Sequence, residues 1–201
     1  NDKVACVASI HEIIRRYYNY ACAAKKGQTS YDTVDRVKLL LNELEISPTD
    51  LEVIKSAKRV GKESNLPCIA LQLEDGRILT GKSKNIISAA GAVILNALKT
   101  LANIDDHPLI SDQILLPILK LKKEVLGSLS SQLSLDDVLI ALAICANSNE
   151  EAASCIKMLP KLKACEAHST FILPTSDELT LKKLGIYLSS EPYFETNNLF
   201  N

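Results

Sequence analysis

The chain has 201 residues, 47% of them hydrophobic, and its 23 basic and 24 acidic side chains give a net charge of −1. This length and composition suit a folded chain with its own core and exclude an intrinsically disordered one. Because no net positive charge would attract nucleic acid or an anionic membrane, we expect neither as a partner. No apolar run approaches the roughly 20 residues of a membrane-spanning helix, so we expect a cytoplasmic protein.

The first 64 residues are predicted to form an antiparallel helical subdomain. Apolar residues at three- and four-residue spacing indicate a helix over residues 4–27, and a second is predicted over residues 30–44 with Ser30 as its N-cap. A third should open at residues 47–50, where serine can cap and proline suits the first helical position. The apolar stripe of the second helix is Val34, Val37, Leu40, Leu41 and Leu44. Since the chain begins without methionine inside a helical pattern, we expect a longer protein.

A β-hairpin is predicted directly after the helical subdomain. Residues 69–73 and 77–80 have the pattern of strands, joined by Asp75-Gly76 as a two-residue turn in which glycine supplies a positive φ. Residues 76–83 also match the phosphate-loop pattern G-x-x-x-x-G-K-S. Because the four intervening positions would then be an extended strand, they cannot wrap around a phosphate. We therefore reject a nucleotide-binding loop.

The α/β domain as a whole is predicted to span residues 65–201. Its strongest helix pattern covers residues 83–103, and the small side chains of residues 88–92 would let another backbone, or a ligand, approach closely. Residues 138–146 form a short apolar run that fits a buried strand or a buried helix, and the preceding Ser134 favours the helix. Further helices are expected over residues 111–127, 149–162 and 176–184, and strands over residues 166–173 and 185–188. The last β-α-β run predicts a parallel pair of strands.

Six cysteines are scattered along the chain, and none forms a C-x-x-C pair. This spacing favours buried free thiols in a reducing compartment over a disulfide framework or a zinc site. We expect no bound metal, and no pattern in the chain indicates a cofactor. The cysteines are Cys6, Cys22, Cys68, Cys145, Cys155 and Cys165.

Two clusters are candidates for chemistry. Glu166 and His168 fall on one face of a predicted strand, so they could form an acid–base pair, although we favour a histidine that is simply hydrogen-bonded at the margin of the sheet. Gly81, Lys82 and Ser83 would open the central helix, where N–H groups, an ammonium and a hydroxyl could hold a phosphate or carboxylate. A shared site would require Lys82 to lie close to His168.

Eight runs of residues have a specific order and spacing. They are EIIRRYY (12–18), DGRILTGK (75–82), LNALK (95–99), IDD (104–106), DVLIAL (137–142), LPKL (159–162), CEAHS (165–169) and KKLGI (182–186). The last seven resemble the C-terminal part of the bacterial domain-of-unknown-function family 1846, also called uncharacterised protein family 0371. The first is similar to the helical region that precedes this part in the family.

The resemblance implies a cytoplasmic bacterial protein whose N-terminal half is absent here. It also implies a layered α/β domain similar in outline to the cytidine-deaminase-like fold. Deaminase chemistry does not carry over, because those enzymes hold zinc with a His or Cys and a Glu that open the central helix, together with a C-x-x-C pair. Here residues 83–86 open the predicted helix with Ser-Lys-Asn-Ile, and no such pair exists.

These observations predict an α/β fold, with a layered mixed sheet and flanking helices, preceded by the antiparallel helical subdomain. We expect a structural and assembly module without a complete catalytic site, whose partners are the N-terminal half of the full-length protein and further copies in a homo-oligomer. The alternative is half of a ligand or substrate site that binds an anionic, phosphate-bearing small molecule. Whether the protein is an enzyme stays open.

Overall fold

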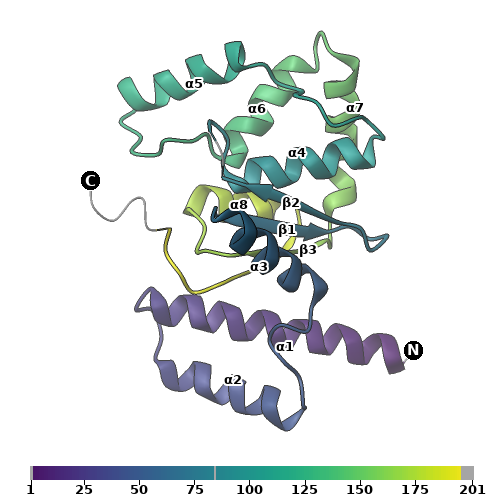
Figure 1. Cartoon of the computed structure of the whole chain (residues 1–201), viewed down its shortest axis with the longest axis vertical. Helices are drawn as coiled ribbons and strands as arrows, with labels where there is room; N and C mark the ends of the chain where they lie inside the picture. Colours follow the sequence, from purple (N-terminus) through teal and green to yellow (C-terminus); the bar gives the residue numbers. More distant parts are fainter. Residues whose placement is uncertain (1, 84, 196–201) are drawn as a thin grey trace.

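The computed structural model describes residues 2–83 and 85–195, with side chains from residue 7 onward. Its centre is a four-stranded mixed sheet in the order β2-β1-β3-β4, which confirms the α/β class (Figure 1). β1 pairs antiparallel with β2 and β3, and β3 pairs parallel with β4, as the β-α-β pattern predicted. The strands are β1 (Cys68–Gln72), β2 (Ile78–Lys82), β3 (Glu166–Ser169) and β4 (Tyr187–Ser190).

Helices cover both faces of this sheet. On one face lie α1 and α3, with α2 on the side of α1 that is remote from the sheet, and on the other lies α4, with α5, α6 and α7 beyond it (Figure 1). α8 connects β3 to β4 and packs against α6. The helices are α1 (Asp2–Lys25), α2 (Tyr31–Glu43), α3 (Glu52–Ser64), α4 (Ala89–Leu101), α5 (Asp112–Glu124), α6 (Leu135–Cys145), α7 (Glu150–Met158) and α8 (Thr175–Lys183), and a 3₁₀ turn spans Leu159–Leu162.

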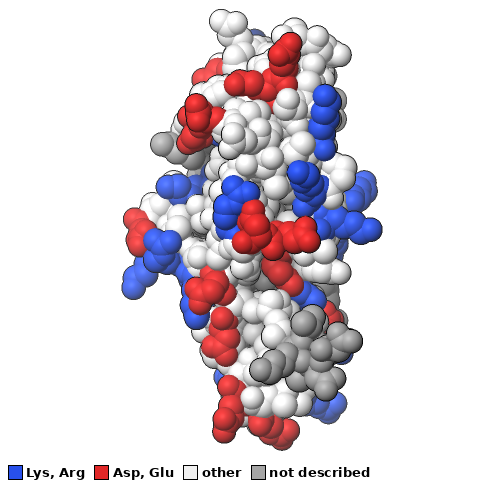
Figure 2. Space-filling model, turned by 90° about the vertical axis from the view of Figure 1, so that its right-hand side faces the viewer, with Lys and Arg blue, Asp and Glu red and all other residues white. Residues whose placement is uncertain are grey.

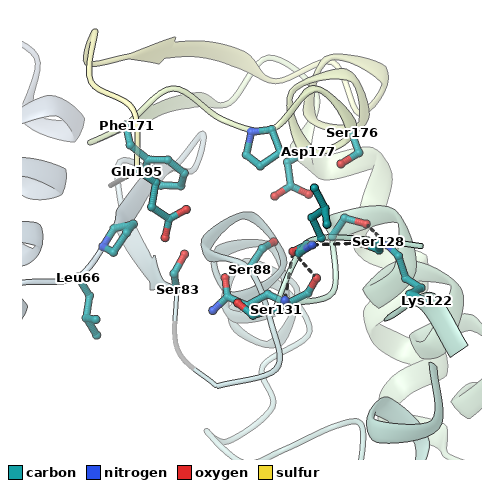
Figure 3. A pocket seen from close by; sticks show the side chains of 16 residues that line it. Leu66, Ser83, Ser88, Lys122, Ser128, Ser131, Phe171, Ser176, Asp177 and Glu195 are labelled. Atoms are coloured by element: carbon teal, nitrogen blue, oxygen red, sulfur yellow. Dashed lines mark hydrogen bonds between the residues drawn. The ribbon is translucent and has the colours of Figure 1, made fainter. Parts of the chain in front are cut away.

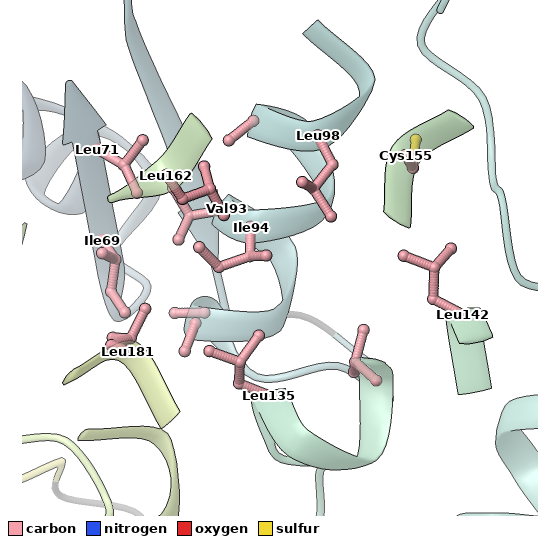
Figure 4. Packing of buried hydrophobic residues seen from close by; sticks show 14 of the residues in the cluster. Ile69, Leu71, Val93, Ile94, Leu98, Leu135, Leu142, Cys155, Leu162 and Leu181 are labelled. Atoms are coloured by element: carbon pink, nitrogen blue, oxygen red, sulfur yellow. The ribbon is translucent and has the colours of Figure 1, made fainter. Parts of the chain in front are cut away.

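The main core lies between the sheet and the layer formed by α4, α6, α7 and α8. Side chains at alternate positions of β1 point into this layer, where they meet one flank of α4, and the opposite flank of α4 meets α6 and α7 (Figure 4). The labelled members are Ile69, Leu71, Val93, Ile94, Leu98, Leu135, Leu142, Cys155, Leu162 and Leu181. The prediction that the helix after the hairpin is central is therefore confirmed.

The hairpin prediction is confirmed in its strands and corrected in its turn. Positions 77–80 of the phosphate-loop pattern do not coil: Ile78 pairs with Gln72, and the ladder continues to Lys82 opposite Cys68. The turn is a three-residue loop, because Leu73 N–H donates to the carbonyl of Arg77, and Gly76 alone in the loop has a positive φ, of 86°. Such a loop is a type I turn followed by a left-handed glycine.

Two predicted helix starts are wrong. α4 begins at Ala89, with Ser88 as its cap, six residues after the predicted start at residue 83. Residues 85 and 86 form a turn, and Ile87 is bridged to Leu133, which holds it outside the helix. α3 begins at Glu52, because residues 47–50 form a separate turn in which the Asp50 carboxylate accepts from Ser47 N–H at 2.8 Å.

Other expectations are borne out. Ser30 caps α2, and residues 138–146 belong almost entirely to a helix, α6. Cys68, Cys145, Cys155 and Cys165 are buried free thiols and Cys22 is a half-buried one, whereas the side chain of Cys6 lies outside the described residues. Among the helices that the structure describes, none is long and apolar enough to cross a bilayer.

The helical subdomain shares its core with the sheet. Ile14 of α1 and Ile54 of α3 are fully buried in one cluster with Ala70 of β1. This contact joins the two predicted subdomains, so a boundary near residue 64 stays a prediction. The likeness to the deaminase-like fold also stays a prediction. Acidic and basic side chains are interspersed over the face shown in Figure 2.

Candidate functional site

Glu166 belongs to an ion-pair cluster that ties α1 to the start of the inner strand β3. Its carboxylate accepts a hydrogen bond from the Arg15 guanidinium and lies 3.4 Å from Nδ1 of His11. Arg15 also binds Glu12 at 2.9 Å, and its guanidinium lies over the Tyr187 ring, 4.5 Å from the centroid. This arrangement neutralises Glu166 with groups from the first helix and gives it a structural partner.

His168 lies on the same face of β3 but in a separate, fully buried environment. Its Nδ1 is 2.8 Å from the Ser189 hydroxyl, and its Nε2 is 3.4 Å from a carboxylate oxygen of Glu191. The ring packs edge-on against Tyr18, with centroids 4.8 Å apart. Glu191 is held in turn by Lys58 of α3 at 2.9 Å. The histidine therefore connects the sheet to α1 and α3.

The protonation of this cluster follows from its burial. Burial lowers the pKa of His168, and the nearby Glu191 carboxylate only partly opposes this effect, so the imidazole is neutral at pH 7. Burial alone would raise the pKa of Glu191, but the nearby imidazole of His168 and ammonium of Lys58 outweigh it and lower that pKa. The Ser189 hydroxyl is within hydrogen-bond distance of Nδ1, whereas Nε2 and the Glu191 oxygen beside it are buried and form no hydrogen bond within the described residues.

The sequence predicted that Glu166 and His168 share a face, and the structure gives each a different partner. The carboxylate beside His168 comes from Glu191, after β4, and the base beside Glu166 comes from Arg15. His168 has no exposed surface, so in this arrangement it cannot touch a substrate. We favoured a histidine hydrogen-bonded at the margin of the sheet; His168 is hydrogen-bonded, but on the inner strand β3 and not at the margin.

The predicted anion-binding residues do not open a helix. Gly81 and Lys82 are the last two residues of β2, and the N-terminus of α4 lies beyond them at Ala89. A β-carbon at Gly81 would lie 2.1 Å from the backbone nitrogen of Val93, so this glycine permits β2 to approach α4. Ser83, the third predicted residue, is 7% exposed and lines a cavity.

This cavity has a volume of about 560 Å³ and lies where three helices begin. Ser88 caps α4, Ser134 caps α6, and Ser176 lies in the first turn of α8. The three N-termini direct the positive ends of their dipoles toward it. In Figure 3 the Ser83 hydroxyl and the Asp177 carboxylate are turned toward the same space. Further lining side chains are Lys122, Ser128, Ser130, Ser131, Phe171 and Glu195.

The charged groups of the cavity have fixed roles. Asp177 is 2% exposed, and its Oδ1 accepts from the backbone N–H of Leu135 at 2.7 Å. Burial raises the pKa of Asp177, and burial likewise raises that of Glu195. The ammonium of Lys122 donates hydrogen bonds to the Asp137 carboxylate and to the Ser134 hydroxyl. Among the described lining residues, the acidic groups therefore outweigh the basic ones that are free of an ion pair.

Sequence reasoning missed Asp177, Ser88 and Ser134 as parts of one site. Their only signal was local, because each is a residue type that suits the start of a helix. Glu191 had no signal at all. Within the described residues, no three His, Cys, Asp or Glu side chains are grouped so that they could hold a metal ion.

A second surface concerns the outer helix, α2. Two of the five residues in its predicted apolar stripe, Val34 and Leu41, are buried and Val37 is half-buried, whereas Leu40 and Leu44 are 42% and 48% exposed. Leu40 and Leu44 are four residues apart and so lie on one side of the helix. The correction to the prediction is that this side has no cover within the described residues.

Comparison with known proteins identifies similar sequences over the whole chain. Residues 49–200 match the model "Domain of unknown function DUF1846, C-terminal", and residues 1–45 match that of the N-terminal domain. A UPF0371 protein of Clostridioides difficile is 44% identical over 209 residues, and those of Clostridium tetani and Clostridium botulinum (strain Langeland) are 42% and 43% identical. Each match covers 100% of this chain and 42% of the relative, so the chain spans less than half of their length.

Proposed function

This chain belongs to the DUF1846 family of bacterial proteins, and we propose that it is a structural and assembly module that docks onto the N-terminal part of the longer protein. The observation that carries the proposal is the open part of the apolar stripe on α2, at Leu40 and Leu44. Leu40 and Leu44 lie next to each other on one side of the helix, and covering their side chains with a partner would be favourable because it removes apolar surface from water.

The family comparison supports a segment of the longer protein as the partner that covers Leu40 and Leu44. α1 and α2 lie within residues 1–45, the stretch that matches the N-terminal domain model, whereas the sheet lies within the C-terminal match. The two helices are thus the part of this chain that belongs with the N-terminal domain. Since the relatives are more than twice as long as the matched region, they contain a further segment that can cover α2.

The test is to mix this chain with the remainder of the Clostridioides difficile relative, expressed as a separate piece, and to measure the mass of the complex by size exclusion with light scattering. A double variant, Leu40→Glu and Leu44→Glu, should abolish the complex. The matched control is Ile140→Glu and Ile144→Glu on α6, which has the same spacing and exposures of 59% and 56%. The control variant should still bind.

The same measurement on the chain alone tests the homo-oligomer. If the leucine stripe also joins copies, the chain should elute above the monomer mass and the double leucine variant should not. A chain that stays monomeric and also fails to bind the remainder of the relative would contradict the assembly role.

A second candidate function is half of a ligand site, and the position of Ser83 supports it. Residue Ser83 is 7% exposed and lines the cavity at the three helix N-termini. The other two residues of the anion hypothesis, Gly81 and Lys82, are not among the lining residues. The support is thus for a site at the cavity, and thermal-shift measurements with phosphate, sulfate and nucleotides test the anionic form of the hypothesis.

A further inference from the structure

We propose that the cavity bounded by Ser83, Ser88, Ser176, Asp177 and Glu195 binds a neutral, polyhydroxylated small molecule of the size of a pentose or hexose sugar. This inference rests on the candidate function of the cavity as a ligand site and names the class of ligand. The cavity has a volume of about 560 Å³, which falls in the range of roughly 300–1,000 Å³ that is usual for small-molecule sites.

Asp177 supplies the fixed acceptor. The N–H of Leu135 donates to its Oδ1 at 2.7 Å, and Ser88 lines the same cavity. An ionised carboxylate has about four lone-pair directions, so about three remain for hydroxyl groups of a ligand. Because the backbone donor and the burial of the side chain restrict its orientation, Asp177 is prepared to accept hydrogen bonds without much further ordering.

Ser83 supplies an independent sign of a ligand. Its side chain is 7% exposed and is turned into the cavity (Figure 3), and no hydrogen bond to its hydroxyl is present among residues 2–83 and 85–195. The oxygen atom keeps surface that is open to the cavity, where a ligand can pair with it. A ligand hydroxyl can both donate to this oxygen and accept from it.

The charges argue against an anion. The carboxylates of Asp177 and Glu195 both reach the cavity, whereas Lys122, the lysine among the described lining residues, is bound to Asp137. A phosphate placed here would face these two carboxylates, and no described lining residue offers it a free ammonium, although the helix dipoles would partly offset the negative charge. Hydroxyl groups avoid this repulsion, since they donate to the carboxylates and accept from Ser83 and Ser176.

The test is saturation-transfer NMR on this chain with D-ribose, D-glucose and, by phosphorus relaxation, inorganic phosphate. Two variants change the site and one serves as a control. Asp177→Asn keeps the oxygen that accepts from Leu135 but removes the charge, and Ser176→Trp places a bulky ring at the exposed start of α8. Asp136→Asn is the control, because it makes the same charge change on an exposed residue outside the cavity wall.

At least one sugar should give saturation transfer with the unmodified chain and with Asp136→Asn. Asp177→Asn should weaken this binding by roughly tenfold to a hundredfold, the loss expected for one charge-assisted hydrogen bond, and Ser176→Trp should abolish it. Binding of phosphate alone, blocked by Ser176→Trp, would overturn the class of ligand while preserving the site. Sugar binding that survives Ser176→Trp, or no binding of any probe, would overturn the site as well.

Discussion

Replacing Gly81 with alanine tests why the second glycine of the phosphate-loop pattern is needed. Gly81 has no positive φ, so its backbone conformation is open to any residue. A β-carbon there would lie 2.1 Å from Val93 N and 2.7 Å from both Ala89 O and Val93 Cα, all of them backbone atoms of α4. Ordinary contact begins at 3.4 Å, so β2 and α4 would have to separate by roughly 1.3 Å.

The expected loss in the free energy of unfolding is about 3 kcal/mol. Overpacking of a dense core costs about 1–3 kcal/mol, and a clash between backbone atoms falls at the upper end because no side-chain rotation relieves it. Gly76→Ala is the matched control, since a β-carbon there meets nothing within 4 Å but must accept a φ of 86°. That left-handed conformation costs about 1–2 kcal/mol.

The assay is urea unfolding of both variants, followed by far-ultraviolet circular dichroism, with the slope of the transition compared between them. Gly81→Ala should unfold at a clearly lower urea concentration than Gly76→Ala, with an unchanged slope. If Gly81→Ala loses less than about 1 kcal/mol, or less than Gly76→Ala, the close approach of β2 and α4 is not the reason for this glycine.

Two further predictions concern the buried carboxylate at the cavity and the buried histidine. Asp177→Ala should lower the free energy of unfolding by about 1–3 kcal/mol, because it leaves the buried N–H of Leu135 without an acceptor, and Asp177→Asn should cost less in the same urea titration. His168 has its pKa lowered from 6.5, so the unfolded chain takes up this proton first as the pH falls. Its contribution to stability is therefore complete above pH 6.5 and declines below it, by at most about 1.4 kcal/mol per pH unit. As the pH is lowered from about 7.5 to about 5, a range around the reference histidine pKa, the urea concentration at the unfolding midpoint should fall. His168→Gln should remove the part of this pH dependence that begins near pH 6.5. If the pH dependence of the midpoint is unchanged in this variant, the lowered pKa is contradicted.

Local patterns in the sequence were enough to predict most elements of the fold. Alternation and turn residues predicted β1 and β2, and helical spacing together with a suitable cap predicted α2 and α6. The start of α4 was wrong because Ile86 and Ile87 continue the helical spacing of apolar residues. What holds them outside the helix is a pairing with Leu133, forty-six residues further along the chain, which no local pattern contains.

The partners of the candidate residues depend on such distant contacts even more strongly. The period of two placed Glu166 and His168 on one face, and the structure agrees. Their partners Arg15 and Glu191 come from the first helix and from the end of β4, so the two residues serve separate clusters. Sequence spacing can therefore predict that two side chains share a face of a strand, but not which groups of the surrounding elements neutralise them.

The glycines of the phosphate-loop pattern show how a motif can arise without its function. Gly76 is needed because the hairpin loop ends in a left-handed residue, and Gly81 because α4 lies against β2. Lys82 ends the strand on the exposed side, and Ser83 is buried beside the cavity. Four positions thus meet four unrelated local requirements, and the pattern by itself carries no information about phosphate. A phosphate-loop match is evidence for nucleotide binding only where the residues between its glycines are free of a strand partner.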